Sequence, residues 1–93
     1  MNDLEVRHDA DAARYELVGA GSVIGLIDYV ERGDADVFTH TEVFPAHRGK
    51  GLAAILVRAA LDDARSRGRA VVPQCWYVAA FIDDHADYQD LRA

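Results

Sequence analysis

The segment Arg48-Gly49-Lys50-Gly51 carries the residue types and spacing that most directly suggest chemistry. It stands between a run typical of a strand and a segment with helical periodicity. Glycine lets a backbone approach a ligand without a Cβ in the way, and the first amides of a helix are unpaired and bind anions, phosphate above all. The segment therefore predicts an anion site to which Arg48 and Lys50 add positive charge. A plain helix start with two solvated cations would show the same pattern.

Two nucleotide-binding motifs fit this loop poorly. In a P-loop the lysine is followed by serine or threonine, whereas here Gly51 follows it. A dinucleotide-binding fold needs a third glycine where Ala54 stands, and an acidic residue after the next strand, where Gln74 and Cys75 stand. The loop also follows a series of antiparallel strands rather than opening a βαβ unit.

Four short strands are predicted before the loop. Apolar and polar residues alternate in them, and turns rich in glycine and aspartate separate them, as in "GAG" and "ERGDAD". Turns this short join antiparallel neighbours. The predicted strands are Leu4–Asp9, Arg14–Val18, Ser22–Val30 and Asp36–Val43.

A change of period predicts a helix after the loop, with Gly68 as its C-cap. Its predicted core face comprises Leu52, Ile55, Leu56, Ala59, Ala60 and Ala64. The later segments are a strand over Ala70–Cys75, a shorter helix over Tyr77–His85 and a polar tail anchored by Tyr88 and Leu91. A helix between two strands most simply makes them parallel neighbours. The predicted fold class is therefore α+β, with a mixed, mostly antiparallel five-stranded sheet and two helices, in a single domain over residues 1–93.

Composition and charge limit the classes of function. The formal net charge is -6 and there is one cysteine. An acidic chain lacks the basic surface that nucleic acid requires. No apolar run reaches the length of a membrane helix. The polar N-terminus does not have the pattern of a signal peptide. We expect a cytoplasmic monomer or weak homodimer with no nucleic-acid or membrane partner. His8, His47 and His85 lack ligand-like spacing, so we expect them on the surface and expect no metal site.

The loop and its flanking elements resemble the GNAT superfamily of acyl-CoA N-acyltransferases. Residues Arg48 to Ala53 match its [Q/R]-x-x-G-x-[G/A] motif, and the superfamily's order of strand, motif, long helix, strand and helix is reproduced from about Ser22 to Asp84. The length is similar to that of the small, single-domain GNAT-like proteins. The resemblance implies an N-acyltransferase that uses acetyl-CoA without a metal, or else a non-catalytic module that binds CoA or acyl-CoA for regulation.

The resemblance also implies where CoA would lie. Its pyrophosphate would rest on the loop amides, and its pantetheine arm would follow the strand over 39–44, where this strand splays from 71–75. An amine acceptor, a small molecule or a basic peptide, would meet the thioester near the strand ends. The implied cofactor-binding residues are Val43, Arg48, Gly49, Lys50, Gly51, Leu52 and Ala53.

Three side chains near those strand ends are catalytic candidates. His40 could act as a base toward the amine or toward Cys75. Glu42 shares the face of His40, and an environment that favours its protonated form would make it a base instead. Cys75 could carry the acyl group or line its pocket. For each of the three an ordinary structural role remains open: a strand histidine, an exposed carboxylate and a buried thiol.

Parts of the larger superfamily members have no counterpart in this sequence. The segment 9–13 is too short for the helices that they insert between their first two strands, and no further strands follow the second helix before Ala93. The tyrosine that serves as the acid in many members of the superfamily falls on Ile82, and neither Tyr77 nor Tyr88 takes its position. We therefore expect an acceptor groove that is open or completed by another subunit.

Overall fold

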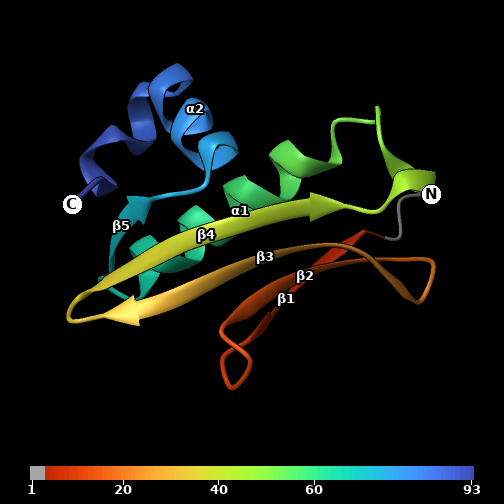
Figure 1. Cartoon of the computed structure of the whole chain (residues 1–93), viewed down its shortest axis with the longest axis horizontal. Helices are drawn as coiled ribbons and strands as arrows, with labels where there is room; N and C mark the ends of the chain where they lie inside the picture. The colour runs from red at the N-terminus through yellow and green to blue at the C-terminus, as the bar shows by residue number, and fades with distance from the viewer. Residues whose placement is uncertain (1–3) are drawn as a thin grey trace.

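The chain forms a mixed five-stranded sheet with two helices, which confirms the predicted fold class (Figure 1). The computed structural model describes residues 4–93; residues 1–3, which the domain and signal-peptide predictions included, lie outside them. The strand order is β1-β2-β3-β4-β5, antiparallel except for the parallel β4–β5 pair. The elements are β1 (Glu5–Asp9), β2 (Arg14–Gly19), β3 (Ser22–Arg32), β4 (Ala35–Val43), η1 (Pro45–His47), α1 (Leu52–Ser66), β5 (Ala70–Pro73), α2 (Trp76–Asp84) and η2 (Ala86–Leu91).

One hydrophobic core lies between the sheet and α1, with α2 and η2 packed beside α1. Helix α1 buries Leu52, Leu56, Val57, Ala60, Leu61 and Ala64. The prediction for two core positions was wrong, because Ile55 is 43% exposed and Ala59 is only partly buried. This helix is apolar enough to offer two overlapping faces, and contact with the sheet selects the one that contains Val57 and Leu61.

Strand β4 carries a bulge next to the residue at which its pairing with β5 ends. The register shifts so that Asp28 pairs with His40 and Tyr29 with Phe38, which leaves Thr39 as the extra residue. The β4–β5 ladder ends at Phe38, whose carbonyl accepts the last hydrogen bond, from the Cys75 amide at 2.8 Å. Beyond this point β4 continues to Val43 with one edge free of β5, so the two strands diverge as the resemblance implied.

Cys75 and the C-terminal segment differ from their predicted structures. Cys75 does not end β5, which stops at Pro73, but directly precedes α2. The polar tail is the 3₁₀ helix η2, although Tyr88 and Leu91 are buried anchors as predicted. The Arg58 guanidinium lies over the rings of both Phe81 and Tyr88, and these contacts hold α2 and η2 against α1.

No helix in residues 4–93 is long and apolar enough to cross a membrane.

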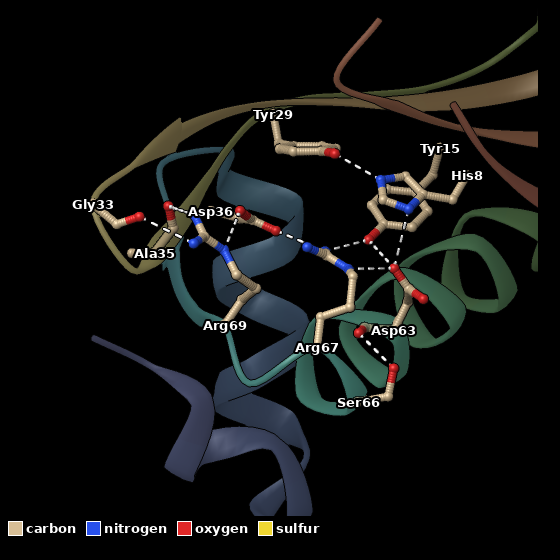
Figure 2. Close-up of polar contacts among 10 residues, drawn as sticks. All are labelled: His8, Tyr15, Tyr29, Gly33, Ala35, Asp36, Asp63, Ser66, Arg67 and Arg69. Carbon is tan, nitrogen blue, oxygen red and sulfur yellow. Dashed lines mark hydrogen bonds and ion pairs between the residues drawn. The ribbon is translucent and has the colours of Figure 1, made fainter. Parts of the chain in front are cut away.

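A polar network ties the strands to the C-terminal end of α1, far along this helix from the glycine loop (Figure 2). Asp36 is fully buried and paired with Arg67 at 2.8 Å and Arg69 at 3.0 Å. The Tyr15 hydroxyl donates to Asp63 at 2.6 Å, and Arg67 donates to both groups. A buried carboxylate needs such partners. The Asp36 pairs therefore hold the turn before β5 against β4.

Acidification is expected to weaken the fold in part through Asp63. Burial alone would raise the pKa of Asp63, but hydrogen bonds from Tyr15 and Arg67 outweigh it and the pKa lies below its ordinary value. A carboxyl group with a lowered folded-state pKa stabilises the fold above its unfolded pKa, about 4, and this stability is lost as the pH falls through the folded pKa. Asp63→Asn should therefore lower the free energy of unfolding at pH 7 by roughly 1–2 kcal/mol and should flatten its decline below pH 4.

Urea denaturation at neutral and acid pH checks this expectation. Asp83→Asn is the matched control, because Asp83 also pairs with an arginine, Arg92 at 2.9 Å, but is 63% exposed and an exposed pair contributes about 0–1 kcal/mol. An Asp63→Asn variant whose stability falls with pH as steeply as that of the wild type would contradict the assigned role of the network.

Candidate functional site

A groove runs along the edge of β4 that β5 leaves free. Its first part has a volume of about 440 Å³ and is lined by His40, Thr41, Glu42, Val43, Arg48, Ala53, Trp76 and Tyr77. Its second part, about 240 Å³, reaches the glycine loop and is lined by Val43, His47, Arg48, Gly49, Gly51, Leu52, Ala53 and Tyr77. Four residues line both parts, so the groove connects the end of β4 to the start of α1.

The loop end of the groove is built to receive an anion. Gly49 and Gly51 adopt left-handed φ angles of 81° and 72°, and a Cβ on either would meet no atom within 4 Å. Helix α1 begins directly after Gly51, and neither a capping side chain nor an acidic residue lies at its first turn. The unpaired amides and the positive end of the helix dipole therefore remain available to a ligand.

The two basic side chains of the loop take different places. Arg48 lines both parts of the groove, and its Nε donates to the Val43 carbonyl at 2.8 Å. Lys50 instead lines a neighbouring pocket, with Ala20 and Ile24 among its other walls. Arg48 is thus the cation that lines the groove, whereas Lys50 lies outside it and contributes only its charge.

Lys50→Ala is expected to weaken anion binding only modestly. An exposed charge beside a ligand contributes up to about 1 kcal/mol, and ions screen it. Calorimetric titration with CoA at low and high salt should show a loss of no more than about fivefold, which shrinks as salt rises. A loss that does not depend on ionic strength would instead mean that Lys50 shapes the loop.

The free edge of β4 presents backbone groups to the groove. Val43 lies opposite Gly25, and the Phe44 amide donates to the Ile24 carbonyl at 2.9 Å. Residues in an antiparallel pair alternate between bonded and non-bonded positions. The Val43 amide therefore points away from β3 and toward the groove, where a ligand can accept its hydrogen bond.

The structure pairs two of the three catalytic candidates with each other and the third with Thr41. His40 Nε2 lies 3.2 Å from Glu42 Oε1, and the two side chains are 56% and 39% exposed. Cys75 is buried, and its Sγ lies 3.4 Å from Thr41 Oγ1. Thr41 alternates with His40 and Glu42 along β4, so its side chain points to the opposite face. His40 is therefore paired with Glu42 and not with Cys75.

Thr41 is a functional candidate that the sequence reasoning missed. It lines the groove and contacts the thiol behind it. Its position between His40 and Glu42, opposite the end of the following strand, was the available signal. His47 was also expected to be a solvated residue, but it is partly buried and lines the loop end of the groove.

The other two histidines, His8 and His85, were expected on the surface and are partly buried. Their rings stack on Tyr15 and Phe81, with centroids 4.3 and 3.9 Å apart. Within residues 4–93 no group of three or more histidine, cysteine or carboxylate side chains is placed to hold a metal ion.

Two aromatic residues at the start of α2 form the groove wall opposite β4. Trp76 is 77% exposed, and its ring meets that of Tyr77 edge-on, with centroids 5.7 Å apart. Tyr77 lines both parts of the groove. By contrast, Tyr88 lies against α1 with its hydroxyl on Asp62, and Ile82 is fully buried.

In this sheet the parallel strands β4 and β5 diverge, and helix α1 begins beside them, directly after the glycine loop. This is the arrangement of the acyl-CoA N-acyltransferase class. The chain belongs to the GCN5-related N-acetyltransferase family, whose model matches residues 14–91. Protein NATD1 of Danio rerio is 31% identical over 92 residues, which cover 96% of this chain and 83% of that protein.

Solved structures share the fold. The solution structure of a GCN5-like protein from Staphylococcus aureus superposes with a TM-score of 0.75 at 19% identity, covering all of this chain and 91% of that one. The N-acetylglutamate synthase of Neisseria gonorrhoeae, solved with coenzyme A and N-acetyl-glutamate, superposes with a TM-score of 0.57 at 16% identity, covering 73% of this chain and 18% of that one.

Proposed function

We propose that this protein transfers an acyl group, most simply acetyl, from coenzyme A to an amine. The observation that carries the proposal is the continuity of the groove between the open amides at the start of α1 and the free edge of β4. Coenzyme A matches both ends, because it joins a pyrophosphate to an arm that contains two amides. The strand end of the groove is lined by His40 and Glu42, which would face the thioester.

In this arrangement the first turn of α1 holds the pyrophosphate. The amides from Gly49 to Ala53 donate to its oxygens, and Arg48 adds charge from within the groove. The pantetheine amides pair with the free edge of β4. The thioester of the acyl-CoA then lies near Thr41, in the part of the groove that Trp76 also lines.

The chemistry follows from the groups at that end. The amine attacks the thioester carbonyl, and a backbone N–H on the free edge of β4 is directed to donate to the oxyanion that forms. His40 takes the proton from the amine at Nδ1, because its Nε2 is engaged by Glu42. The carbon–sulfur bond breaks, CoA leaves as a thiolate, and the open groove lets solvent protonate it.

A second candidate function is CoA or acyl-CoA binding without turnover, as a sensor or regulatory subunit. One observation favours it: Ile82 is fully buried, and it stands at the position where, by the resemblance, many members of the superfamily carry a tyrosine acid. Tyr77 lines the groove but comes from the first turn of α2, five positions earlier in the sequence. The two functions share the binding mode and differ only in the acyl-transfer step.

The test is release of free CoA thiol from acetyl-CoA in the presence of a panel of primary amines. Turnover requires thiol release that depends on both protein and amine, with an acetylated amine of the expected mass. CoA binding with no amine-dependent release would favour the regulatory function. Absence of CoA binding would overturn both functions.

Cys75→Ala is expected to retain most of the activity. The thiol is buried and contacts the neutral hydroxyl of Thr41 rather than a base, and direct attack by an amine on a bound thioester needs no acyl-enzyme. Intact-protein mass spectrometry of the wild type after incubation with acetyl-CoA should show no adduct on Cys75. An acetyl adduct there, together with an inactive Cys75→Ala variant, would show that the thiol carries the acyl group.

A further inference from the structure

Trp76 is exposed to an extent that packing does not explain. Its side chain is 77% accessible, although the neighbouring core buries large residues such as Val78 and Ile82 completely. Its one ring contact in the described part of the chain is the edge-on contact with Tyr77. One face of an indole at the wall of a groove is thus left for a ligand, and an exposed aromatic of this size is typical of a binding surface.

The groove also has a charge gradient from one end to the other. The start of α1 makes the loop end positive, and Arg48 lines both parts of the groove, whereas the carboxylate of Glu42 lies only at the strand end, with His40, Thr41 and Trp76. Of the nearby carboxylates, the charge of Asp28 is neutralised by Arg14, whose Nε lies 2.7 Å from Asp28 Oδ1. Glu42 lies opposite the apolar Leu26 and has only His40 as an ion-pair partner among the described residues.

We propose that the strand end of the groove is an acceptor site for an amine that carries a second positive charge. The indole face of Trp76 holds the distal cation by a cation–π contact, and the Glu42 carboxylate supplies the opposing charge. The nearer amine then faces His40. This assignment rests on the proposed function, because it requires that the acyl end of CoA reaches Thr41, and it specifies the class of acceptor as small aliphatic diamines.

The first experiment measures binding and needs no turnover. Trp76 is the single tryptophan of the chain, so its fluorescence reports directly on the site. With CoA bound, putrescine should quench this fluorescence at about tenfold lower concentration than butylamine, which matches putrescine in chain length but lacks the distal cation. The difference should narrow as salt rises. Equal apparent affinities for the two amines would overturn the proposal.

The second experiment uses variants and calorimetry. Trp76→Leu keeps an apolar side chain but removes the π face, and Glu42→Gln removes the charge at constant shape. Each should weaken putrescine binding about tenfold more than butylamine binding, while Trp76→Phe should retain most of the preference for putrescine. Weaker CoA binding with unchanged diamine preference in Trp76→Leu would show instead that Trp76 covers the pantetheine arm.

The two proposals fail separately. Diamine-selective binding without thiol release would support a diamine-binding site at the strand end of the groove and reject the transferase function. Thiol release with equal KM values for putrescine and butylamine would support the transferase and reject the acceptor assignment.

Discussion

His40→Ala is expected to lower turnover by about 10²- to 10⁴-fold, the usual contribution of a general base. His40 lies at the strand end of the groove, and its Nε2 is engaged by Glu42 at 3.2 Å. Nδ1 is thereby left to receive a proton from the amine. The measurement is the steady-state rate of thiol release at saturating acetyl-CoA, with CoA affinity followed through Trp76 fluorescence.

The affinity for CoA should not change in His40→Ala, because nothing in the proposed binding mode uses the imidazole. Glu42→Gln distinguishes the roles of the two side chains. If Glu42 only orients His40 and attracts a cation, the variant raises KM for diamines and lowers kcat less than His40→Ala does. Undiminished turnover in His40→Ala would place the base elsewhere, and a larger kcat loss in Glu42→Gln would assign that role to the carboxylate.

Gly51→Val is expected to lower CoA affinity by about 100-fold or more. The isopropyl group would stand in the open space beside the first amides of α1, where no protein atom lies within 4 Å of a Cβ. Excluding the pyrophosphate from these amides would remove one or two charge-assisted hydrogen bonds, each worth roughly 1.5–3 kcal/mol. Calorimetric titration with CoA measures the loss.

Strain must be separated from exclusion of the ligand in that experiment. A valine at a φ of 72° is strained by about 1–2 kcal/mol, so Gly51→Val will also be less stable. Gly68→Val is the matched control, because Gly68 has a φ of 69°, equally open space and a position at the other end of α1. Both variants should lose similar stability, and only Gly51→Val should lose CoA. Equal CoA affinity in the two folded variants would contradict the assigned pyrophosphate site.

The elements of this fold could be predicted because their signals are local. Period-2 alternation and short glycine turns define β1 to β4, and a single helix between β4 and β5 makes that pair parallel. The glycine loop was also readable, since its function depends on consecutive residues. The divergence of β4 from β5, by contrast, was expected from the resemblance to the GNAT superfamily and not from a local pattern.

The side-chain pairings could not be predicted, because they join residues far apart in the sequence. Tyr15 meets Asp63 across 48 positions, and Cys75 meets Thr41 across 34. Within α1, two apolar faces compete, and only the packed sheet decides that Val57 is buried and Ile55 is not. Local patterns identify the helix faces that are apolar enough to be buried, but packing against the sheet determines which of these faces is buried.

The most direct test of the account is a titration of the ¹⁵N-labelled protein with CoA, followed by amide NMR. We expect the largest shifts at the amides of Gly49, Gly51 and Ala53 and at Val43 on the free edge of β4, with the distant Asp36 amide unchanged. The claim that this groove is a coenzyme A site would be contradicted if the resonances of the loop amides did not shift at saturating CoA. It would also be contradicted if only residues of the neighbouring pocket, such as Ala20, shifted.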